Sequence, residues 1–209
     1  VWPNQYVVEW DFYFVANNSD APPYLPTPSA AYNHTRGTTY YDHDTATGLT
    51  NMRETYDTFC IPVFGDPTAS MGAANDYSCS FINAGKTNTS FVVLTDNRPQ
   101  GAPECCVIGR PFHAPPPSFH SRMPVKWSAT VGATVVDWGA VYDKDAGIFN
   151  YGFERDSGAP FAFYMKGVPW IASWMWQKFH DFEAKQPPSS VWTVPSACES
   201  AGPCPGWAP

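Results

Sequence analysis

Few residue patterns in this sequence are of the kinds that catalyse reactions or bind metal ions. Asp42-His43-Asp44 places two carboxylates beside an imidazole. Residues two apart share a face only in a strand, and hard cations need about six or more oxygen ligands, so we interpret this triplet as a solvated turn. The segment Asp143 to Gly147 resembles the start of a calcium loop but lacks the third carboxylate and the closing Glu. We predict no metal site.

The motifs of several common enzyme classes are absent. The sequence contains no G-x-S-x-G nucleophile elbow, H-E-x-x-H zinc helix, G-x-x-x-x-G-K-[ST] phosphate loop or G-x-G-x-x-G dinucleotide turn. A catalytic base must also meet a nucleophile in space. We predict no catalytic residue and a protein that is not an enzyme, with a hydrolase of atypical site as an alternative. The histidines are His34, His43, His113, His120 and His180.

Aromatic residues near the C-terminus form the group most suggestive of a binding site. Between residues 170 and 182 they follow the three-and-four spacing of one helix face. Such a group can pack in a core, or it can line a cavity for an apolar ligand. We give the two interpretations equal weight. The group comprises Trp170, Trp174, Trp176, Phe179, Phe182 and Trp192.

The composition excludes several function classes. A chain of 209 residues suits a single domain, spanning residues 1–209. Only 12 residues are Lys or Arg and the net charge is −7, so no nucleic-acid partner is expected. No apolar run reaches about 18 residues, so no membrane span is predicted. Because 44% of residues are hydrophobic and only 15% are charged, we expect an exposed apolar patch and a homodimer or a heterodimer with a related chain.

The cysteines and the glycosylation sequons indicate a secreted protein. Six cysteines occur without any C-x-x-C pair, which favours disulfides over zinc. Because the sequence begins with Val1, we expect a signal peptide to have been removed. Asn17, Asn33 and Asn88 each begin a glycosylation sequon. The predicted disulfide-bonded residues are Cys60, Cys79, Cys105, Cys106, Cys198 and Cys204.

The hydrophobic pattern predicts a mainly β protein. Residues 6–15 alternate strictly, with Tyr6, Val8 and Trp10 on an apolar face that continues to residue 14. Pro169 to Lys185 is predicted as one helix, with Pro169 in its first turn. Further strands are predicted over Gly37 to Asp42, Asn51 to Thr58, Ser90 to Thr95, Lys126 to Ala133, Val135 to Tyr142, Ile148 to Arg155 and Phe161 to Lys166.

The C-terminal region resembles that of the ependymin-related secreted proteins. The resemblance rests mainly on the segment Val191-Trp192-Thr193-Val194-Pro195-Ser196-Ala197-Cys198, in which an aromatic residue and a proline precede a cysteine. Upstream, Tyr41-Asp42 with Met52-Arg53-Glu54 and the stretch from Cys79 to Cys105 are similar to early strands and a central hairpin of that family. Pro111-Phe112 and Met123-Pro124 fall where the family has an aromatic residue and a proline.

This resemblance implies a curved antiparallel sheet, a half-barrel similar to bacterial lipoprotein carriers, around a deep apolar pocket. It also implies that Cys79 pairs with Cys204, that Cys105 or Cys106 pairs with Cys198, and that Cys60 takes the cysteine left over. The chain departs from the family because it lacks an N-terminal cysteine and its usual partner near residues 164–169, and has Cys60 and a doubled Cys105-Cys106 instead.

The predicted function is that of a secreted, non-enzymatic carrier of an elongated apolar ligand. In the segments that could line the ligand site, Trp2 to Phe14 and Trp170 to Trp192, aromatic rings dominate over aliphatic side chains, which favours a rigid carotenoid over a fatty acid or other lipid. The resemblance agrees, since the family includes carriers of such pigments. A structural or adhesive protein without a ligand is the alternative from another class. The predicted ligand-binding residues are Trp170, Trp174, Trp176, Phe179 and Trp192, with His113, His120 and Tyr164 as polar partners of the ligand's ends.

Overall fold

A computed structural model describes residues 2–15, 32–58, 60, 78–95, 98, 101–109, 114–143, 147–166 and 174–204. Within these residues one sheet of eleven strands is formed, and each strand is antiparallel to its neighbours. The strands are β1 (Gln5–Val15), β2 (Tyr32–His43), β3 (Thr50–Tyr56), β4 (Cys79–Ala84), β5 (Thr89–Leu94), β6 (Cys105–Gly109), β7 (Val125–Val131), β8 (Thr134–Asp143), β9 (Gly147–Glu154), β10 (Pro160–Lys166) and β11 (Trp174–Glu183).

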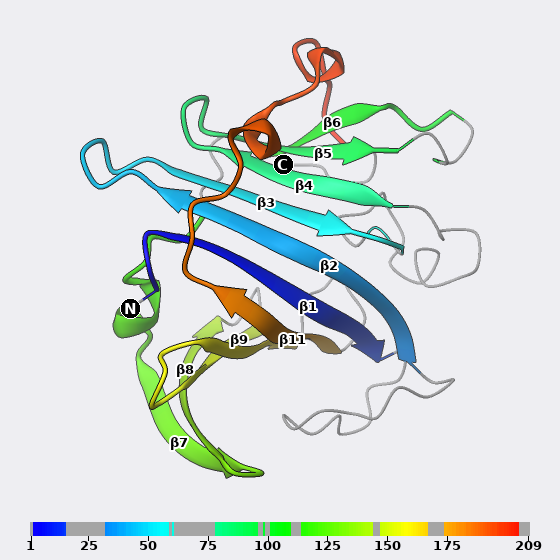
Figure 1. Ribbon diagram of the computed structural model, residues 1–209. Helices are drawn as coiled ribbons and strands as arrows, with labels where there is room; N and C mark the ends of the chain where they lie inside the picture. Colours follow the sequence, from blue (N-terminus) through cyan, green and yellow to red (C-terminus); the bar gives the residue numbers. More distant parts are fainter. Residues whose placement is uncertain are drawn as a thin grey trace.

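Two meanders meet at the centre of the sheet (Figure 1). Strands β1 to β6 run outward in sequence order to one edge, and β7 to β11 run from the other edge back to β1. The connection between the meanders contains the short 3₁₀ helix η3 (Phe119–Arg122). The first and last strands, β1 and β11, are therefore neighbours in the middle of the sheet.

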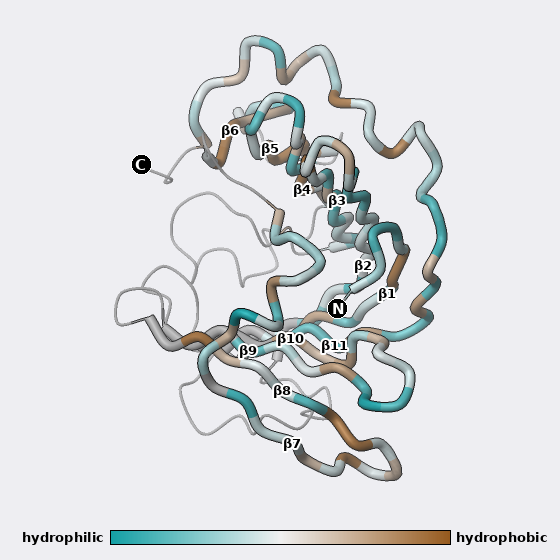
Figure 2. Tube along the Cα trace, turned by 90° about the vertical axis from the view of Figure 1, so that its left-hand side faces the viewer, coloured by the Kyte–Doolittle hydropathy of each residue, from teal (hydrophilic) through white to brown (hydrophobic). Residues whose placement is uncertain are grey.

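The sheet is curved, and one of its faces is concave. The Trp2 ring contacts both Tyr41 on β2, with centroids 5.8 Å apart, and Tyr151 on β9, at 5.6 Å, although four strand spacings separate these strands in the sheet order. At about 4.8 Å per spacing the two strands would lie roughly 19 Å apart in a flat sheet, too far for one ring to contact both. Figure 2 shows the two halves of the sheet inclined toward each other. The predicted curved antiparallel sheet is confirmed.

Strand β1 places its apolar face on this concave side, as its alternation predicts. Tyr6, Val8 and Trp10 are at most 1% exposed, whereas Glu9 on the opposite, convex face is exposed. The seven further predicted strands correspond to β2, β3, β5 and β7 to β10. Strands β4 and β6 were not predicted; both begin at cysteines that the sequence pattern marks only as disulfide candidates.

The predicted helix over Pro169 to Lys185 is wrong where the structure describes it. Trp174–Glu183 forms strand β11, which pairs with β1 on one side and β10 on the other. A central strand is buried on both faces, so its aromatic residues need not alternate and can imitate helical spacing. Trp176 and Phe179 accordingly face opposite sides of the sheet. The short C-terminal helices lie further along, at η4 (Ser189–Trp192) and η5 (Ser196–Cys198).

The C-terminal residues 184–204, named the strap here, lie along the convex face of β3 to β6. Arg53 on β3 donates a hydrogen bond to the carbonyl oxygen of Val191 at 3.0 Å, and Cys198 packs against Phe91 of β5. Among the described residues, no helix is long and apolar enough to cross a membrane.

All six cysteines form disulfides, and two of the three predicted pairings are wrong, that of Cys79 with Cys204 and that of Cys60 with the cysteine left over from Cys105 and Cys106. Cys105 pairs with Cys198, as one of the predicted alternatives has it. Cys79 does not pair with Cys204 but with Cys60, and Cys204 pairs with Cys106. Cys79 lies on β4, whereas Val107 on the edge strand β6 forms a bridge with Pro203, so the chain end reaches β6 and its adjacent cysteine instead.

Candidate functional site

The concave face is lined by aromatic rings from both halves of the sheet. Trp2 contacts Tyr6 with ring centroids 4.9 Å apart and Phe119 of η3 at 4.8 Å, and Phe119 in turn contacts Tyr151 of β9 at 4.8 Å. The Trp2 amide also donates a hydrogen bond to the Pro117 carbonyl oxygen. The N-terminus and η3 thus close one end of the concave face.

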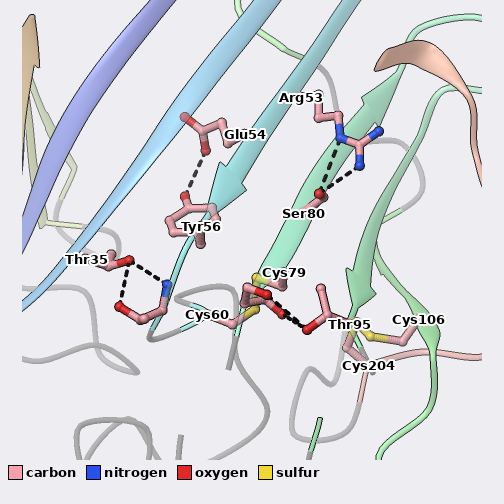
Figure 3. Close-up of a disulfide and its surroundings, with 12 residues drawn as sticks. Thr35, Arg53, Glu54, Tyr56, Cys60, Cys79, Ser80, Thr95, Cys106 and Cys204 are labelled. Atoms are coloured by element: carbon pink, nitrogen blue, oxygen red, sulfur yellow. Dashed lines mark hydrogen bonds between the residues drawn. A yellow bond between two sulfur atoms is a disulfide. The ribbon is translucent and has the colours of Figure 1, made fainter. Parts of the chain in front are cut away.

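Glu54 is the one carboxyl group that the strand register places in the middle of this face, among the described residues. It lies on β3, opposite Thr39 of β2 and Phe81 of β4. The Tyr56 hydroxyl donates to its Oε2 at 3.0 Å, and the Thr39 hydroxyl donates to its Oε1 at 3.4 Å. Figure 3 shows the Tyr56 contact, with both residues on the same strand. The carboxyl group is therefore held in a fixed orientation by hydroxyl donors.

Gly37 allows a tryptophan to complete this arrangement. Its position on β2 lies opposite Trp10 of β1 and Tyr56 of β3. A Cβ atom there would overlap the Trp10 ring and the Thr55 carbonyl oxygen. Without one, the Trp10 ring lies over Gly37 and its Nε1 donates to Thr39 Oγ1 at 2.9 Å. Trp10 therefore donates to Thr39, and Thr39 in turn donates to Glu54.

The electrostatics of the cluster favour uncharged groups. Burial raises the pKa of Glu54, and the hydroxyl donors of Tyr56 and Thr39 together with the nearby Gln177 amide offset only part of this rise. Burial also raises the pKa of Tyr6, Tyr56 and Tyr151, and the nearby Glu54 raises each further. By register, Arg36, Arg53 and Lys178 lie on the convex face, whereas Lys126 of β7 faces the concave side at the far edge of the sheet, opposite Gly139. No described Lys or Arg of β1, β2, β3 or β11 faces the same side as Glu54, so none of them provides a positive counter-charge for it.

The floor of the concave face keeps accessible surface although it lies deep in the protein. Met52 and Glu54 of β3, with Tyr151 and Phe163 across the curve, are only half-buried, whereas Tyr6, Tyr41 and Tyr56 beside them are buried. These half-buried side chains therefore leave part of their surface accessible on the concave face. The carboxyl group and its hydroxyl donors can form hydrogen bonds to a bound molecule.

Several buried donors at this face have no hydrogen-bond partner among the described residues. They include the Tyr6 hydroxyl, the Trp2 Nε1, the Gln177 Nε2 and the Asn83 Nδ2. Tyr6 is 1% exposed and Gln177 is 3% exposed. Buried polar groups are nearly always hydrogen-bonded to protein, water or ligand, so each of these donors indicates a missing acceptor.

Two cavities lie elsewhere. One, of about 490 Å³, lies between β5 and the strap and is lined by Phe91, Val194 and Pro195 among others. The second, of about 570 Å³, opens on the convex face beside Glu9, Asp11 and His180. Both combine polar and apolar walls, and the second also borders Trp10 and Gly37.

The second cavity contains a possible metal-ligand group of three residues. Glu9, His180 and Asp181 bring ligand atoms within 4.8 Å of one another. Both ring nitrogens of His180 already contact carboxylates, Asp181 at 2.8 Å and Asp11 at 3.4 Å. Ion pairing accounts for this cluster. The Asp42-His43-Asp44 triplet is not a turn as predicted, because Asp42 and His43 end strand β2. The turn begins at Asp44, which accepts a hydrogen bond from the Ala46 amide at 2.8 Å. Residues 144–146 of the calcium-loop candidate lie outside the described part.

The predicted ligand-binding residues do not form one wall. Phe179 faces the concave side, and His120 of η3 packs on Phe153 there with ring centroids 4.5 Å apart. Trp176 packs with Tyr13 and Trp138 on the convex face. Trp192 lies half-buried in the strap. Trp174 and Tyr164 lie in β11 and β10, while Trp170 and His113 lie outside the described residues.

Glycosylation of the three sequons stays a prediction. Asn88 lies in the turn between β4 and β5 with a positive φ of 51°. Asn33 lies within β2, and Asn17 is outside the described residues.

Neither a protein-family model nor a curated protein matches the sequence. Several solved structures resemble the fold weakly. The MucA/MucB complex of Pseudomonas aeruginosa gives a TM-score of 0.41 at 9% identity over 93% of this chain, which spans about 56% of that chain. A DUF1329 family protein from Desulfovibrio piger gives 0.44 at 8% identity over 93% of this chain and 91% of its own. A LolA superfamily protein from Nitrosomonas europaea gives 0.36 at 7% identity over 92% of this chain and 91% of its own. Likenesses at these scores support no inference about function.

Proposed function

We propose that this protein is a non-enzymatic carrier that binds an elongated apolar ligand against the concave face of its sheet. The observation that carries the proposal is the accessible floor formed by Met52, Tyr151 and Phe163 within an otherwise buried aromatic lining. Apolar surface of this kind gains about 25 cal/mol for each Å² that a ligand covers. A ligand lying along the curve would contact strands of both meanders.

Among apolar ligands, a planar polyene such as a carotenoid suits this lining better than a fatty acid. Tyr151 stacks with Phe163 at 4.6 Å and with Phe179 at 6.5 Å between centroids, so flat rings follow one another along the face. A rigid conjugated rod loses little conformational entropy on binding and can lie against successive rings. A fatty acid also needs a positive group at its carboxylate, and no described Lys or Arg of β1, β2, β3 or β11 faces the concave side.

We also propose that the protein is extracellular and related to the ependymin-type carriers. Three disulfides support an oxidising compartment. A strap that ends in cysteine-bonded contacts supports the family resemblance of residues 191–198. Dimer formation stays a prediction that light scattering over a range of concentrations checks.

Extraction of protein purified from its natural source tests the carrier proposal. Organic solvent should release an apolar compound in a fixed ratio to protein, and a visible absorption band should disappear from the protein as a polyene leaves. An acyl lipid in the extract without a visible band would reject the carotenoid but keep the carrier. Protein that carries no compound and binds none added would favour a structural or adhesive role.

A further inference from the structure

We infer that the cluster around Glu54 selects ligands whose polar end is a neutral oxygen, a hydroxyl or a ketone, over ligands that end in a carboxylate. This inference rests on the proposed carrier function and adds the chemistry of the ligand's polar group. The cluster consists of Glu54, Tyr6 and Gln177, with Tyr56 and Thr39 holding the carboxyl group.

The donors for such an oxygen are present and unpartnered among the described residues. Tyr6 on β1 and Gln177 on β11 face the concave side from adjacent central strands, and each is at least nine-tenths buried. The Tyr6 hydroxyl and the Gln177 Nε2 make no hydrogen bond there. Tyr6 lies opposite Tyr41, which lies opposite Met52, two residues from Glu54 on the same face of β3, whereas Gln177 lies opposite Phe12, further along β1. The shifts of the pKa of Tyr6 and of Glu54 agree with this proximity. A ligand oxygen between Tyr6 and Glu54 would satisfy a buried donor that otherwise stays unpaired.

Glu54 also explains why the oxygen should be neutral. A ligand carboxylate placed beside it would put two acids in a buried site without a described cation to compensate either charge. Two carboxylates that share such a site cannot both ionise without strong repulsion. A hydroxyl avoids this repulsion, because it can accept from Tyr6 or Gln177 and donate to Glu54. A ketone accepts from the same donors.

A matched series of polyenes tests the inference. Retinol, retinal and retinoic acid share one chain and differ only in the end group, so their affinities for ligand-free protein isolate the polar end. Quenching of tryptophan fluorescence by the polyene reports binding. At pH 7.5 we expect retinol and retinal to bind at least about tenfold more tightly than retinoic acid, since one buried hydrogen bond and the avoided repulsion together exceed about 1.4 kcal/mol.

Two conservative variants locate the effect at the cluster. Glu54→Gln removes the charge but keeps an acceptor for Tyr56, and it should bring retinoic acid to within about threefold of retinol. Tyr6→Phe removes only the hydroxyl and should weaken retinol and retinal about fivefold. Glu9→Gln and Tyr40→Phe, on the convex face, are matched controls that should leave all three affinities unchanged. Circular dichroism establishes that each variant is folded.

The possible outcomes distinguish failure of this inference from failure of the proposed carrier function. Equal binding of the three retinoids, or preference for the acid, would overturn the selection of neutral oxygen while the carrier function stands. Selectivity that survives Glu54→Gln would also overturn it. Failure of all three and of the longer diol zeaxanthin to bind would contradict the carrier function itself, and the inference with it.

Discussion

Cys105 and Cys106 are neighbours in the chain, yet their disulfides lie on opposite faces of the edge strand β6. Cys105 belongs to the cluster beneath the strap and bonds Cys198, while Cys106 belongs to the concave core and bonds Cys204. Alternation along a strand produces this division. The strap therefore passes around the edge of the sheet, where the Val107 amide donates to the Gly202 carbonyl oxygen at 2.8 Å. An edge that could pair with another chain is covered.

Removing either bond should free one side of the strap. Replacing Cys105 and Cys198 with serine, or Cys106 and Cys204 with alanine, should each lower the free energy of unfolding by about 2 to 4 kcal/mol. Urea unfolding measures the loss. Peptide mapping without reduction should show Cys60 joined to Cys79, and a peptide that joins Cys79 to Cys204 would contradict this arrangement.

Arg53 should anchor the strap to the convex face. Its Nη2 donates to Ser80 Oγ at 2.9 Å and its Nη1 donates to the Val191 carbonyl oxygen. Arg53→Met keeps the apolar stem and should lower stability by about 2 kcal/mol, because hydrogen bonds of a charged donor are lost. Hydrogen exchange should increase in residues 188–194. Ser80→Ala keeps the Val191 contact, so its effect on that segment should be smaller; an equal effect would argue against the anchor.

Much of the fold could be predicted because β1 and the strap have unambiguous local patterns. Alternation in residues 6–14 fixes the apolar face of β1 whatever its neighbours are. Strand β11 could not be recognised in this way, since its burial on both faces depends on pairing with β1, more than 160 residues earlier in the chain. The Cys79 pairing likewise depends on where the chain end meets β6, which is a tertiary contact.

Gly37→Ala should disturb both stability and binding. The added methyl group would overlap Trp10 and the Thr55 carbonyl, so the Trp10 ring must move away from Thr39. We expect unfolding to require at least about 2 kcal/mol less, as in other overpacked cores, together with weaker polyene binding. Gly202→Ala is the control, because nothing lies within 4 Å of the added atom; a similar loss there would contradict the explanation.

The pH dependence of stability should report Glu54. The pKa of Glu54 is raised on folding, so the folded state favours the protonated carboxyl group. The contribution of this group to the free energy of unfolding is complete below its unfolded pKa of about 4.3, and it is lost as the pH rises through the folded pKa. Tyr6, Tyr56 and Tyr151 stay neutral there because their pKa values are raised. The stability of the wild type relative to Glu54→Gln should therefore fall from pH 4 towards neutral. Urea titrations at each pH measure this difference, and a constant difference would contradict a buried carboxyl.

The site was harder to predict from sequence than the fold. The candidate aromatic group follows helical spacing, but on a strand that spacing divides it, so Trp176 and Phe179 face opposite sides. Glu54 carried one usable signal, since it stands between Met52 and Tyr56 at the period of a strand face that is otherwise apolar. A single polar residue in such a pattern is also typical of an exposed edge, and only the curvature of the sheet places it opposite Tyr151.

Photo-crosslinking tests the central claim, that the ligand lies on the concave face, most directly. A retinal analogue with a diazirine on its polyene would be bound, irradiated, and mapped by peptide mass spectrometry with unlabelled retinal as competitor. The claim predicts competed labels on Met52, Tyr151 and Phe163, from strands of both meanders. Competed labels on Phe91 and Val194, in the cavity beneath the strap, would contradict it.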